Sequence, residues 1–440
     1  MMDNNLPDGF RMTEIGLVPE EWEVHRLASL DMEISDGNYA SKYPRQSDFI
    51  DRGVPFIRAN NFSDYRIIWE DMRFISEQKH SELQKGHLKK NDILITTRGQ
   101  LGNVALVTDE FVDGNINAQI VRINTRDTVE PIFMLYYLSS FRSQREINSL
   151  RTGTTLPQLP IGKLNQVPII IPPLPEQKNI ATVLSTIQEA KEKTQAVIEA
   201  TRELKKSLMK HLFTYGPVSP EDADKVPLKE TEIGMVPEEW ELVKLEDICI
   251  SFFGGGTPST RVPEYWDGDI HWTTSAYING LYLNEGVKNI TLQGLENSSS
   301  NLVPSGNLLI GTRVGVGKVA INLVDIAISQ DLTGVIVDKD KVHLEFLALA
   351  LMTDQSQGIF RLGSRGTTIK GIPRDDLVKI PIPLPSLTIQ HQIADILSAV
   401  DHKIEAEENK KQALEELFKT LLNNLMTGRI RVNHLDISWR

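Results

Sequence analysis

The segment Thr13–Leu27, TEIGLVPEEWEVHRL, occurs a second time as TEIGMVPEEWELVKL at Thr231–Leu245. A further pair follows in the same order: DILITTRGQLGNVALV at Asp92–Val107 matches NLLIGTRVGVGKVAIN at Asn307–Asn322. The repeat unit is about two hundred residues long, which is the size of a domain and far longer than the unit of a solenoid. The sequence therefore predicts a duplicated domain in a tandem or pseudo-twofold molecule.

The first part of each copy, residues 13–175 and 231–388, combines short β-rich runs such as Ile93–Thr97 with a helical stretch such as Pro131–Leu150. Gly, Pro and Asn interrupt these parts throughout, as they do between the short elements of mixed domains. We therefore expect two tandem α/β (or α+β) domains.

The second part of each copy predicts a long helix. From Gln177 to Phe213 and from Gln390 to Met426 the chain contains no Pro or Gly, and apolar residues recur every seven positions. In the first helix the expected rows are Ile180, Ile187, Thr194, Thr201 and Leu208, and Val183, Ala190, Val197 and Leu204; in the second they include Ile393, Val400, Leu414 and Leu421, and Ile396 and Leu417. This period indicates a coiled-coil seam, and mutual pairing in a compact pseudo-twofold molecule would be antiparallel. Two ordinary long helices are the alternative.

These patterns divide the chain into six parts. Proline-rich hinges precede the helices, because proline is not tolerated in a helix interior. The expected parts are a first domain at 1–175, a first helix at 176–215, a polar and mobile linker at 216–230, a second domain at 231–388, a second helix at 389–428 and a C-terminal tail at 429–440.

Composition indicates a globular protein of the cytoplasm. Hydrophobic residues make up 40% and charged residues 24% of the chain, a globular balance. The single cysteine, Cys249, excludes an internal disulfide and fits a reducing compartment. The first residues lack the basic and apolar regions of a signal peptide, and no apolar run approaches the roughly 20 residues of a membrane helix. We expect no membrane contact.

The formal net charge of −12 argues against nucleic-acid binding by the chain as a whole, because DNA-binding proteins usually carry a basic surface. The charge is uneven, however. Acidic residues concentrate between Glu221 and Asp247, whereas basic residues gather in the first domain at Arg58, Arg66, Arg73, Lys85, Lys89, Lys90 and Arg98. Local basic loops can still bind DNA, and we expect a more basic partner to add affinity.

Segments that resemble catalytic motifs are incomplete. Phe252–Gly256 has the F-x-G-x-G form of adenine methyltransferases, but Pro172–Pro173 lacks the flanking side chains that hold a flipped base. Gly311–Lys318 resembles a phosphate loop with the wrong spacing, and Val319 replaces the required Ser or Thr. The nine histidines show no metal-binding spacing. We therefore expect no catalytic residue, no metal and no cofactor in this chain.

Polar loops at corresponding points of the two copies carry different side chains. Aligning Pro55–Phe62 with Ile270–Tyr277 places Arg58, Asn60 and Asn61 opposite Thr273, Ser275 and Ala276. Arg, Lys, Asn and Gln read base edges, while Ser and Thr serve bases or phosphates. One scaffold with two polar sets is what reading two short DNA sequences requires; surface drift after duplication is the alternative.

The candidate DNA-binding residues lie in three loops of each copy. In the first copy they are Asn38, Tyr39, Lys42, Arg58, Asn60, Asn61, Arg98 and Gln100. In the second copy they are Thr257, Ser259, Arg261, Thr273, Thr274, Ser275, Arg313 and Lys318.

Over nearly its whole length the chain resembles the specificity subunits of type I restriction-modification systems. The resemblance rests on the TEIGxVPEEW openings, the DILxxTRG and LLxxTRVG segments, and the IPPLPEQ element at Ile171–Gln177. It also rests on the helix ends LKKSLMKHLFTYG at Leu204–Gly216 and LFKTLLNNLMTGRIRV at Leu417–Val432. The second hinge departs from the pattern as PSLTIQ at Pro385–Gln390, so the resemblance does not extend to the contacts of this hinge.

The resemblance implies two target recognition domains that each read one half of a split site in double-stranded DNA. It also implies that the helices form an antiparallel coiled coil, set the gap between the half-sites and dock methyltransferase subunits. Those partners would bring S-adenosylmethionine, and a separate restriction subunit would bring ATP-driven translocation and cleavage. Partners that help to enclose the DNA would account for the acidic charge.

Two alternatives remain open at this point. One is a specificity protein of another DNA-methylation or defence complex, which a neighbouring methyltransferase gene would discriminate. The other is a coiled-coil scaffold that binds a protein and not DNA. A DNA mobility shift that depends on added methyltransferase subunit would separate the DNA-binding functions from the scaffold.

Overall fold

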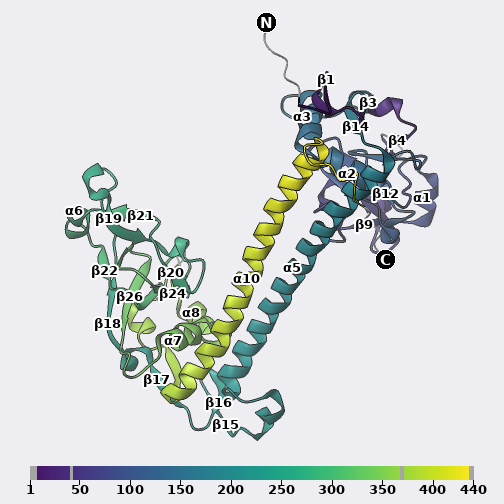
Figure 1. Ribbon diagram of the computed structural model, residues 1–440. Helices are drawn as coiled ribbons and strands as arrows, with labels where there is room; N and C mark the ends of the chain where they lie inside the picture. The colour runs from purple at the N-terminus through teal and green to yellow at the C-terminus, as the bar shows by residue number, and fades with distance from the viewer. Residues whose placement is uncertain (1–6, 40–42, 367–370, 436–440) are drawn as a thin grey trace. The chain divides into compact units, whose positions relative to one another are not determined.

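The structure, a computed structural model, describes residues 7–39, 43–366 and 371–435. The chain divides into two compact units: unit 1 comprises residues 1–195 and 409–440, and unit 2 comprises residues 196–408. Both boundaries fall inside the long helices α5 (Leu174–Tyr215) and α10 (Leu387–Met426), labelled in Figure 1. Each of these helices therefore contributes a part to each unit.

The described residues of unit 1 form a six-stranded sheet and a four-stranded sheet, with a helix pair against the larger one. The six-stranded sheet has the order β4 (Glu33–Asp36), β13 (Ile120–Asn124), β10 (Ile93–Thr96), β11 (Val104–Leu106), β8 (Arg66–Ile67) and β7 (Phe62–Ser63). The four-stranded sheet has the order β12 (Asn115–Ile116), β6 (Val54–Ile57), β9 (Arg73–Ile75) and β5 (Phe49–Ile50). The helix pair is α2 (Pro131–Ser139) and α3 (Phe141–Ser149).

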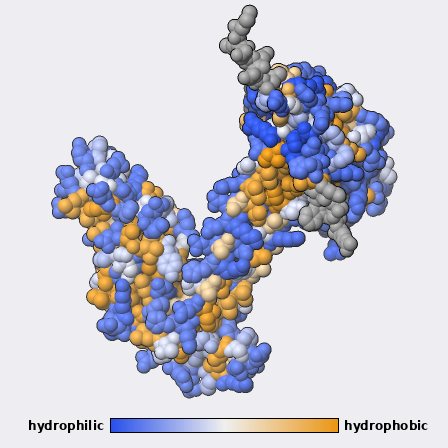
Figure 2. All heavy atoms as spheres, viewed as in Figure 1, coloured by the Kyte–Doolittle hydropathy of each residue, from blue (hydrophilic) through white to orange (hydrophobic). Residues whose placement is uncertain are grey.

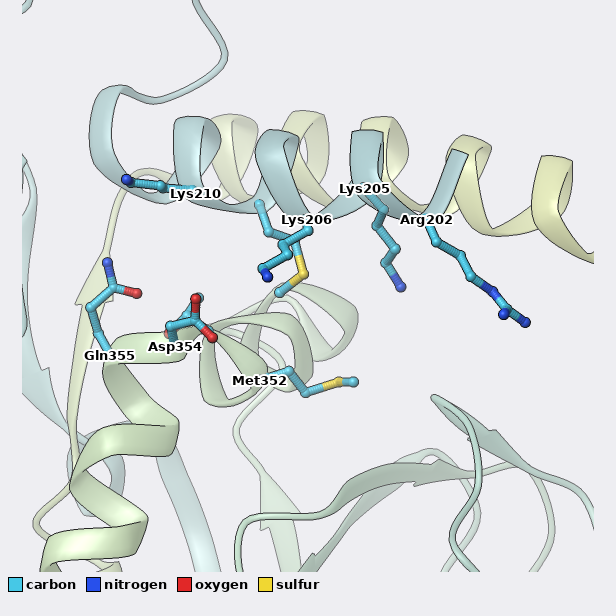
Figure 3. A pocket seen from close by; sticks show the side chains of 9 residues that line it. Arg202, Lys205, Lys206, Lys210, Met352, Asp354 and Gln355 are labelled. Carbon is cyan, nitrogen blue, oxygen red and sulfur yellow. The ribbon is translucent and has the colours of Figure 1, made fainter. Parts of the chain in front are cut away.

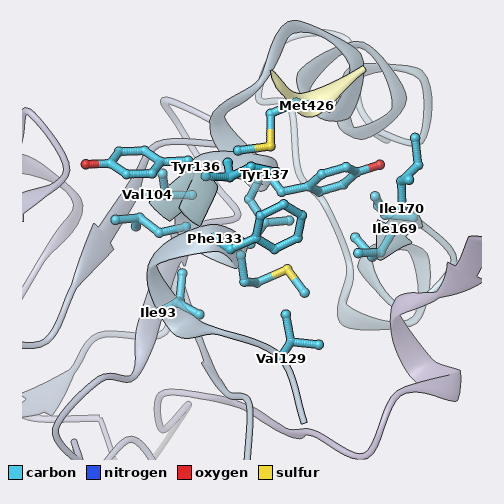
Figure 4. Close-up of a cluster of buried hydrophobic side chains, with 14 of the residues drawn as sticks. Ile93, Val104, Val129, Phe133, Tyr136, Tyr137, Ile169, Ile170 and Met426 are labelled. Carbon is cyan, nitrogen blue, oxygen red and sulfur yellow. The ribbon is translucent and has the colours of Figure 1, made fainter. Parts of the chain in front are cut away.

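The core of unit 1 forms where α2 covers the larger sheet. β10 reads ILIT and is buried at every position, and α2 buries six consecutive residues from Phe133 to Leu138. In Figure 4 the rings of Phe133 and Tyr137 lie between Ile93 of the sheet and Ile169 of a neighbouring strand. Burying each such side chain contributes about 1.5–3 kcal/mol, so this cluster is the main source of the unit's stability.

Unit 2 repeats this plan. Its five-stranded sheet has the order β18 (Cys249–Gly254), β26 (Leu332–Val337), β23 (Asn307–Gly311), β24 (Val319–Asn322) and β20 (Tyr282–Leu283). Its four-stranded sheet has the order β21 (Lys288–Ile290), β19 (Trp266–Thr273), β25 (Ile326–Ile328) and β22 (Asn301–Val303). Helices α7 (Leu344–Met352) and α8 (Asp354–Gly363) take the places of α2 and α3.

Strand pairing shows that the two units share one topology. The pairs β11·β8 and β12·β6 are parallel in unit 1, and their counterparts β24·β20 and β19·β25 are parallel in unit 2. The remaining pairs of both sheets are antiparallel within the described residues. This confirms the expected duplication into two tandem domains of mixed sheet and helix.

The long helices begin at Leu174 and Leu387, two residues before the expected limits of 176 and 389. Helix α5 includes Pro175 in its first turn, where the missing N–H would have no helical partner in any case. In unit 1, Ile180 and Leu184 of α5 share a core with Phe418 and Leu425 of α10. In unit 2, the end of α5 shares a core with the start of α10: Leu212, Phe213, Ile393 and Leu397.

One predicted row of each helix is not buried. Val197 and Leu204 are 40% and 51% exposed, and Ile396 and Leu417 are 37% and 45% exposed. The buried row of α5 instead contains Leu184, Lys191, Ile198 and Leu212, and that of α10 contains Leu397, Phe418 and Leu425. The seven-residue period is right, and the other predicted row contains the buried residues Ile180, Thr194 and Ile393. The exposed row was wrong, because the helices also pack against their domains and those contacts select a neighbouring row.

The predicted linker and tail contain ordered structure. Pro220–Lys225 forms a 3-10 helix, η6, inside the predicted linker. Val432, in the predicted tail, is buried in the core of unit 1. None of the helices in the described part of the chain is long and apolar enough to cross a membrane.

Candidate nucleic-acid interface

A cavity of about 760 Å³ in unit 1 brings together several of the predicted side chains. It opens between the 3-10 turn η4 (Ala59–Asn61), which follows β6, and the turn that connects β10 to β11. The predicted residues Arg58, Asn60, Arg98 and Gln100 all line it. The remaining lining residues are Tyr43, Ala59, Phe62, Arg73, Gly99, Asn117, Ala118 and Gln119.

Asp71 orients the first pair of these side chains. The Arg58 guanidinium donates to Asp71 Oδ2 at 2.8 Å and also to the Asp71 carbonyl oxygen, and Asn60 Nδ2 donates to Asp71 Oδ2 at 2.9 Å. The hydrogen bonds and charge of Arg58 hold the pKa of Asp71 below its usual value. Arg58 Nε is buried and has no hydrogen-bond partner among the described residues. The guanidinium is therefore fixed in place through Nη2, and its other N–H groups are not used by these hydrogen bonds.

Arg98 lies on the opposite wall of the cavity. Its guanidinium carbon is 5.3 Å from the centre of the Tyr39 ring, and Gln100 Oε1 accepts a hydrogen bond from Asn103 Nδ2 at 3.2 Å. Burial, and then the neighbouring Asp36, raise the pKa of the Tyr39 hydroxyl, so the ring stays neutral beneath the cation. A stacked guanidinium keeps its donors free to contact a ligand.

Two predicted residues of unit 1 support the loops from inside. Asn61 is fully buried; its Oδ1 accepts from the Arg58 backbone N–H at 3.0 Å, and its Nδ2 donates to the Glu70 carbonyl at 2.8 Å. Asn38 is also buried and donates to the Lys85 carbonyl at 2.7 Å. Both side chains shape loops and are not presented to a ligand. Lys42 lies outside the described residues.

The corresponding turn of unit 2 corrects the sequence alignment by one residue. The turn η9 (Ser275–Tyr277) has Thr274 at its N-cap, where η4 has Arg58. The backbone hydrogen bonds agree, because Asn61 N–H donates to the Arg58 carbonyl as Tyr277 N–H donates to the Thr274 carbonyl. Arg58 therefore corresponds to Thr274, and not to Thr273. These segments share almost no identical residues, so sequence alone could not fix their register.

Several predicted residues in and around the turn η9 are buried or hydrogen-bonded within unit 2. Thr273 and Ser275 are fully buried. Lys318 Nζ donates to the carbonyls of Ser275 at 3.2 Å and Ile278 at 3.0 Å, so this cation holds η9 in place. Thr274 is half-buried at the N-cap.

The other candidates of unit 2 lie in two exposed loops. The Thr257 hydroxyl donates to Gln330 Oε1 at 2.7 Å, and Ser259 Oγ accepts from the Arg261 backbone N–H at 3.4 Å. Arg313 is exposed in the turn between β23 and β24, at the position that Arg98 occupies in unit 1.

Glycine at the base of the first loop is required in both units. A Cβ at Gly37 would overlap the carbonyl oxygen of Asn117, and one at Gly255 would overlap that of Ile328. The loop that carries Tyr39 or Thr257 thereby packs directly on the strand end beside the candidate site. The prediction missed Asn117 and Gln119 because no motif marks them. They line the cavity because the loop after Gly37 packs against the backbone of Asn117.

This set of side chains suits the recognition of base edges on a polyanion. Three arginines and four amide side chains (Asn60, Gln100, Asn117 and Gln119) line one cavity. Arginine pairs with guanine O6 and N7, and Asn or Gln pairs with adenine N6 and N7, each through two hydrogen bonds. Among the residues that the structure describes, no group of three or more His, Cys, Asp or Glu side chains could hold a metal ion.

Comparison with known proteins agrees with this chemistry. The model of the family described as "Type I restriction modification DNA specificity domain" matches residues 19–200 and 237–416. The putative type I restriction enzyme MjaX specificity subunit of Methanocaldococcus jannaschii is 31% identical, over 97% of each chain. The MjaVIII specificity subunit of the same organism is 26% identical, over 95% of each chain.

Solved structures show the same fold. A type I restriction-modification S subunit from M. genitalium matches with a TM-score of 0.58 and 17% identity, covering 92% of this chain and 96% of its own. A chain from a structure of a type I R-M system, solved to explain complex assembly and conformational transition, matches with a TM-score of 0.55 and 17% identity, covering 94% and 99%. With both family matches in place, the chain belongs to the DNA specificity subunits of type I restriction-modification systems, which are non-catalytic recognition subunits.

Proposed function

We propose that this chain recognises a bipartite target in double-stranded DNA, with one half-site read by each unit. The observation that carries the proposal is the cavity of unit 1, where Arg58, Arg98, Asn60 and Gln100 converge. Unit 2 repeats the scaffold but has Thr274 where unit 1 has Arg58. Two copies of one scaffold with different side chains fit the reading of two different half-sites. Since its proposed ligand is DNA, we place the protein in the cytoplasm.

We further propose that α5 and α10 pair as an antiparallel coiled coil and give the molecule pseudo-twofold symmetry. In each unit the start of one helix packs with the end of the other. Ion pairs support this pairing in unit 2, where Lys205 Nζ lies 2.7 Å from Asp401 Oδ1 and Arg202 pairs with Glu408. The domain limits proposed with it are 1–175, 176–215, 216–230, 231–388, 389–428 and 429–440.

We propose that methyltransferase subunits dock on these helices. Val197 and Leu204 of α5 and Ile396 and Leu417 of α10 are exposed apolar residues seven or twenty-one positions apart, as on a helix that awaits a partner. Figure 2 shows hydrophobic residues at the surface along the long helices. The methyltransferase subunits would supply S-adenosylmethionine, and a restriction subunit would join the same complex.

A cavity in unit 2 carries the cations Lys206 and Lys210 beside the ion-paired Arg202 and Lys205, and it suits an acidic segment of such a partner. It measures about 600 Å³ and lies between α5 and the corner where α7 meets α8. In Figure 3 Lys205 and Lys206 of α5 point toward the side of this space on which Met352 and Asp354 lie, whereas Arg202 extends away from both. Basic side chains around methionines favour an acidic amphipathic helix over a bare phosphate, because methionine supplies an adaptable apolar contact.

The experiment combines the purified chain with the methyltransferase subunit of its own system. The chain alone should transfer no labelled methyl group from S-adenosylmethionine to DNA, and the combination should methylate a split motif with an unspecified gap. Methylation of a random-sequence library identifies that motif. Labelling by the chain alone would contradict the assignment, and so would a continuous motif without a gap.

A second experiment tests the helices as a spacer. Seven residues inserted after Lys193 and seven after Ala406 keep the seam in phase and lengthen each helix by about 10 Å, or roughly three base pairs. The gap in the methylated motif should lengthen by that amount while both half-sites stay the same. An unchanged gap with full activity would show that the helices do not set the spacing.

A further inference from the structure

A cation stacked on an aromatic pair stands at the edge of the candidate interface in unit 1. The guanidinium carbon of Arg73, in β9, lies 5.0 Å from the centre of the Phe49 ring. Phe49 in turn meets Phe56 edge-on, with 5.6 Å between ring centres. Arg73 lines the same cavity as Arg58 and Asn60. None of the motifs in the sequence marks Arg73 as a ligand-binding residue.

Unit 2 builds the same arrangement from different side chains. Lys288 Nζ lies 5.1 Å from the centre of the Trp266 ring, and Trp266 meets Trp272 edge-on at 5.4 Å. Strand register shows that the two cations are equivalent, because Arg73 pairs with Phe56 as Lys288 pairs with Trp272.

The rings that carry the cations are equivalent as well. Phe49 pairs with Ile75, and Trp266 pairs with Ile290, in each case the residue two positions after the cation. The cation, the ring beneath it and the ring at its edge thus occupy the same three places in each unit, although all three side chains differ in identity.

At the positions around this cation, by contrast, the two units carry side chains of different chemical type. Arg58, Asn60 and Gln100 of unit 1 correspond to Thr274, Ala276 and Gly315 of unit 2. The ring beneath Arg98 is also lost, since Thr257 stands where unit 1 has Tyr39. Side chains that differ suit two different base sequences. A cation kept on its ring suits a task that is the same at both half-sites.

The aromatic support holds this cation without an ion pair, although the charge of Arg73 also helps to lower the pKa of Asp71. Arg58 is held by the Asp71 carboxylate, which cancels much of its charge. Within the described residues neither Arg73 nor Lys288 has an acidic partner at ion-pair distance; each is positioned by a ring instead. A ring attracts the cation through its quadrupole without adding a negative charge. The invariant anion of DNA is the phosphate, which carries no sequence information.

We propose that Arg73 and Lys288 are equivalent backbone clamps, each binding a phosphate of the half-site that its unit reads. The residues that differ between the units read the bases. The clamps fix each unit on the duplex without contributing to its choice of sequence. This inference rests on the proposed function in one respect, namely that DNA is the ligand.

The test measures how salt weakens DNA binding. The full chain with its methyltransferase subunit is titrated against a labelled 30-base-pair duplex of random sequence, from 50 to 300 mM KCl, by fluorescence anisotropy. Arg73→Gln and Lys288→Gln remove the charge but keep an aliphatic stem over the ring. Each should weaken binding about eightfold at 0.1 M salt and reduce the slope of log K against log salt by about 0.9, the value for one phosphate.

Charge-preserving variants separate a clamp from a structural role. Arg73→Lys and Lys288→Arg exchange the two cations and should keep both the slope and the affinity within about twofold. Lys163→Ala and Lys379→Ala, at exposed cations outside both aromatic groups, are the matched controls and should behave like the unchanged protein. The melting temperature of each variant verifies its fold, and Arg73→Met replaces Arg73→Gln if the latter unfolds.

Three results would overturn the inference. Wild-type slopes in both Gln variants, with the unchanged complex binding DNA normally, would remove the clamps and leave the proposed function intact. A change of methylated motif in either Gln variant would make that residue a base reader. A complex that binds no duplex at any salt concentration would overturn the proposed function and the clamps together.

Discussion

The two units share a framework and differ at its polar surface. Gln177 Oε1 accepts the Glu130 N–H at 2.9 Å, and its Nε2 donates to the Pro172 carbonyl at 2.8 Å. In unit 2, Gln390 makes the same two bonds, to the His343 N–H at 2.7 Å and the Pro385 carbonyl at 2.8 Å. The altered second hinge, PSLTIQ, therefore keeps this contact. Buried hydrogen bonds have been retained where packing demands them, while the loop side chains have changed.

A second difference lies where the first turn of each long helix packs against its own unit. In unit 1 the buried Glu176 accepts from Trp22 Nε1 at 2.9 Å and from Arg431 Nε at 2.7 Å. The hydrogen bonds that Arg431 donates to Glu176, and then to Glu21, raise the pKa of its guanidinium. Unit 2 has Ile389 in place of Glu176 and closes around apolar residues. The comparison teaches that, in one topology, the start of the long helix can be held either by a buried ion pair or by hydrophobic packing.

The largest expected effect on stability comes from breaking the ion pair between Arg431 and Glu176. Arg431→Ala leaves the carboxylate of Glu176, which is 1% exposed, without its cation. Breaking a buried pair from one side costs about 3–5 kcal/mol, so the free energy of unfolding of unit 1 should fall by that amount. Hydrogen exchange measured by mass spectrometry reports the two units separately. Unit 2 should be unaffected, and Arg429→Ala, at an exposed cation, should change neither; equal loss in both units would contradict this account.

The shared framework should respond equally in the two units. Gln177→Ala and Gln390→Ala each remove two hydrogen bonds and leave a part-buried N–H and a buried carbonyl unpaired, at a cost of about 1–3 kcal/mol. Chemical denaturation followed by hydrogen exchange should show similar losses, each in its own unit. Gln166→Ala, at an exposed glutamine, is the control. A loss in only one unit would mean that the two glutamines do not have the same role.

The reading loops should respond separately. Arg58→Ala removes a candidate base contact worth about 1–3 kcal/mol, so discrimination at one half-site should fall roughly tenfold or more while the other stays intact. Thr274→Ala should relax the opposite half-site. Methylation mapping of a random library with the partner methyltransferase measures both. Lys90→Ala, whose cation pairs with Asp109 away from the cavity, should leave the motif unchanged. Uniform weakening across both half-sites would assign Arg58 to phosphate.

The smallest expected effect is on pH. Each unit has a pair of histidine rings in contact: His80 meets His87 edge-on at 4.3 Å between ring centres, and His343 lies tilted against His391 at 4.0 Å. Burial, together with the neighbouring ring, lowers the pKa of His80 and of His343.

A lowered pKa fixes the sign of this pH dependence. The folded units bind fewer protons than the unfolded chain once the pH falls below about 6.5, so both units should lose some stability there and none above it. Denaturation midpoints between pH 7.5 and 5.5 measure the loss, and His80→Gln should reduce it in unit 1 alone. Stability that rises toward acid would contradict the assignment.

Much of this architecture was readable from the sequence because the chain repeats itself. The TEIGxVPEEW openings, the TRG turns and the proline-free helices predicted two tandem domains and two long helices, and each is present. The family also followed from these segments. Periodicity gave the helices but selected one wrong row, since helix packing against a domain leaves no separate signal in a seven-residue pattern.

The candidate site was predictable only in part. Arg58, Asn60, Arg98 and Gln100 do converge, because the turn after β6 of the four-stranded sheet and the turn after β10 of the six-stranded sheet line the same cavity. Asn61, by contrast, donates its side-chain hydrogen bond to the backbone near its own turn, and Lys318 donates to the backbone of a neighbouring turn. Composition cannot distinguish a polar side chain that faces a ligand from one that satisfies the backbone, because both belong to the same residue types.

The split composition of unit 1 has a consequence for how the chain folds during synthesis. Its core includes Phe418, Leu422, Leu425 and Met426, which are made last, whereas unit 2 is one continuous stretch. The N-terminal domain therefore emerges first from the ribosome but cannot complete its core until the final helix arrives. Contacts across more than two hundred residues also carry a large loop-closure entropy, which slows their formation. Until then Ile180 and Leu184 lack their α10 partners, and the nascent chain is most exposed to aggregation and proteolysis at the surface that α10 later covers.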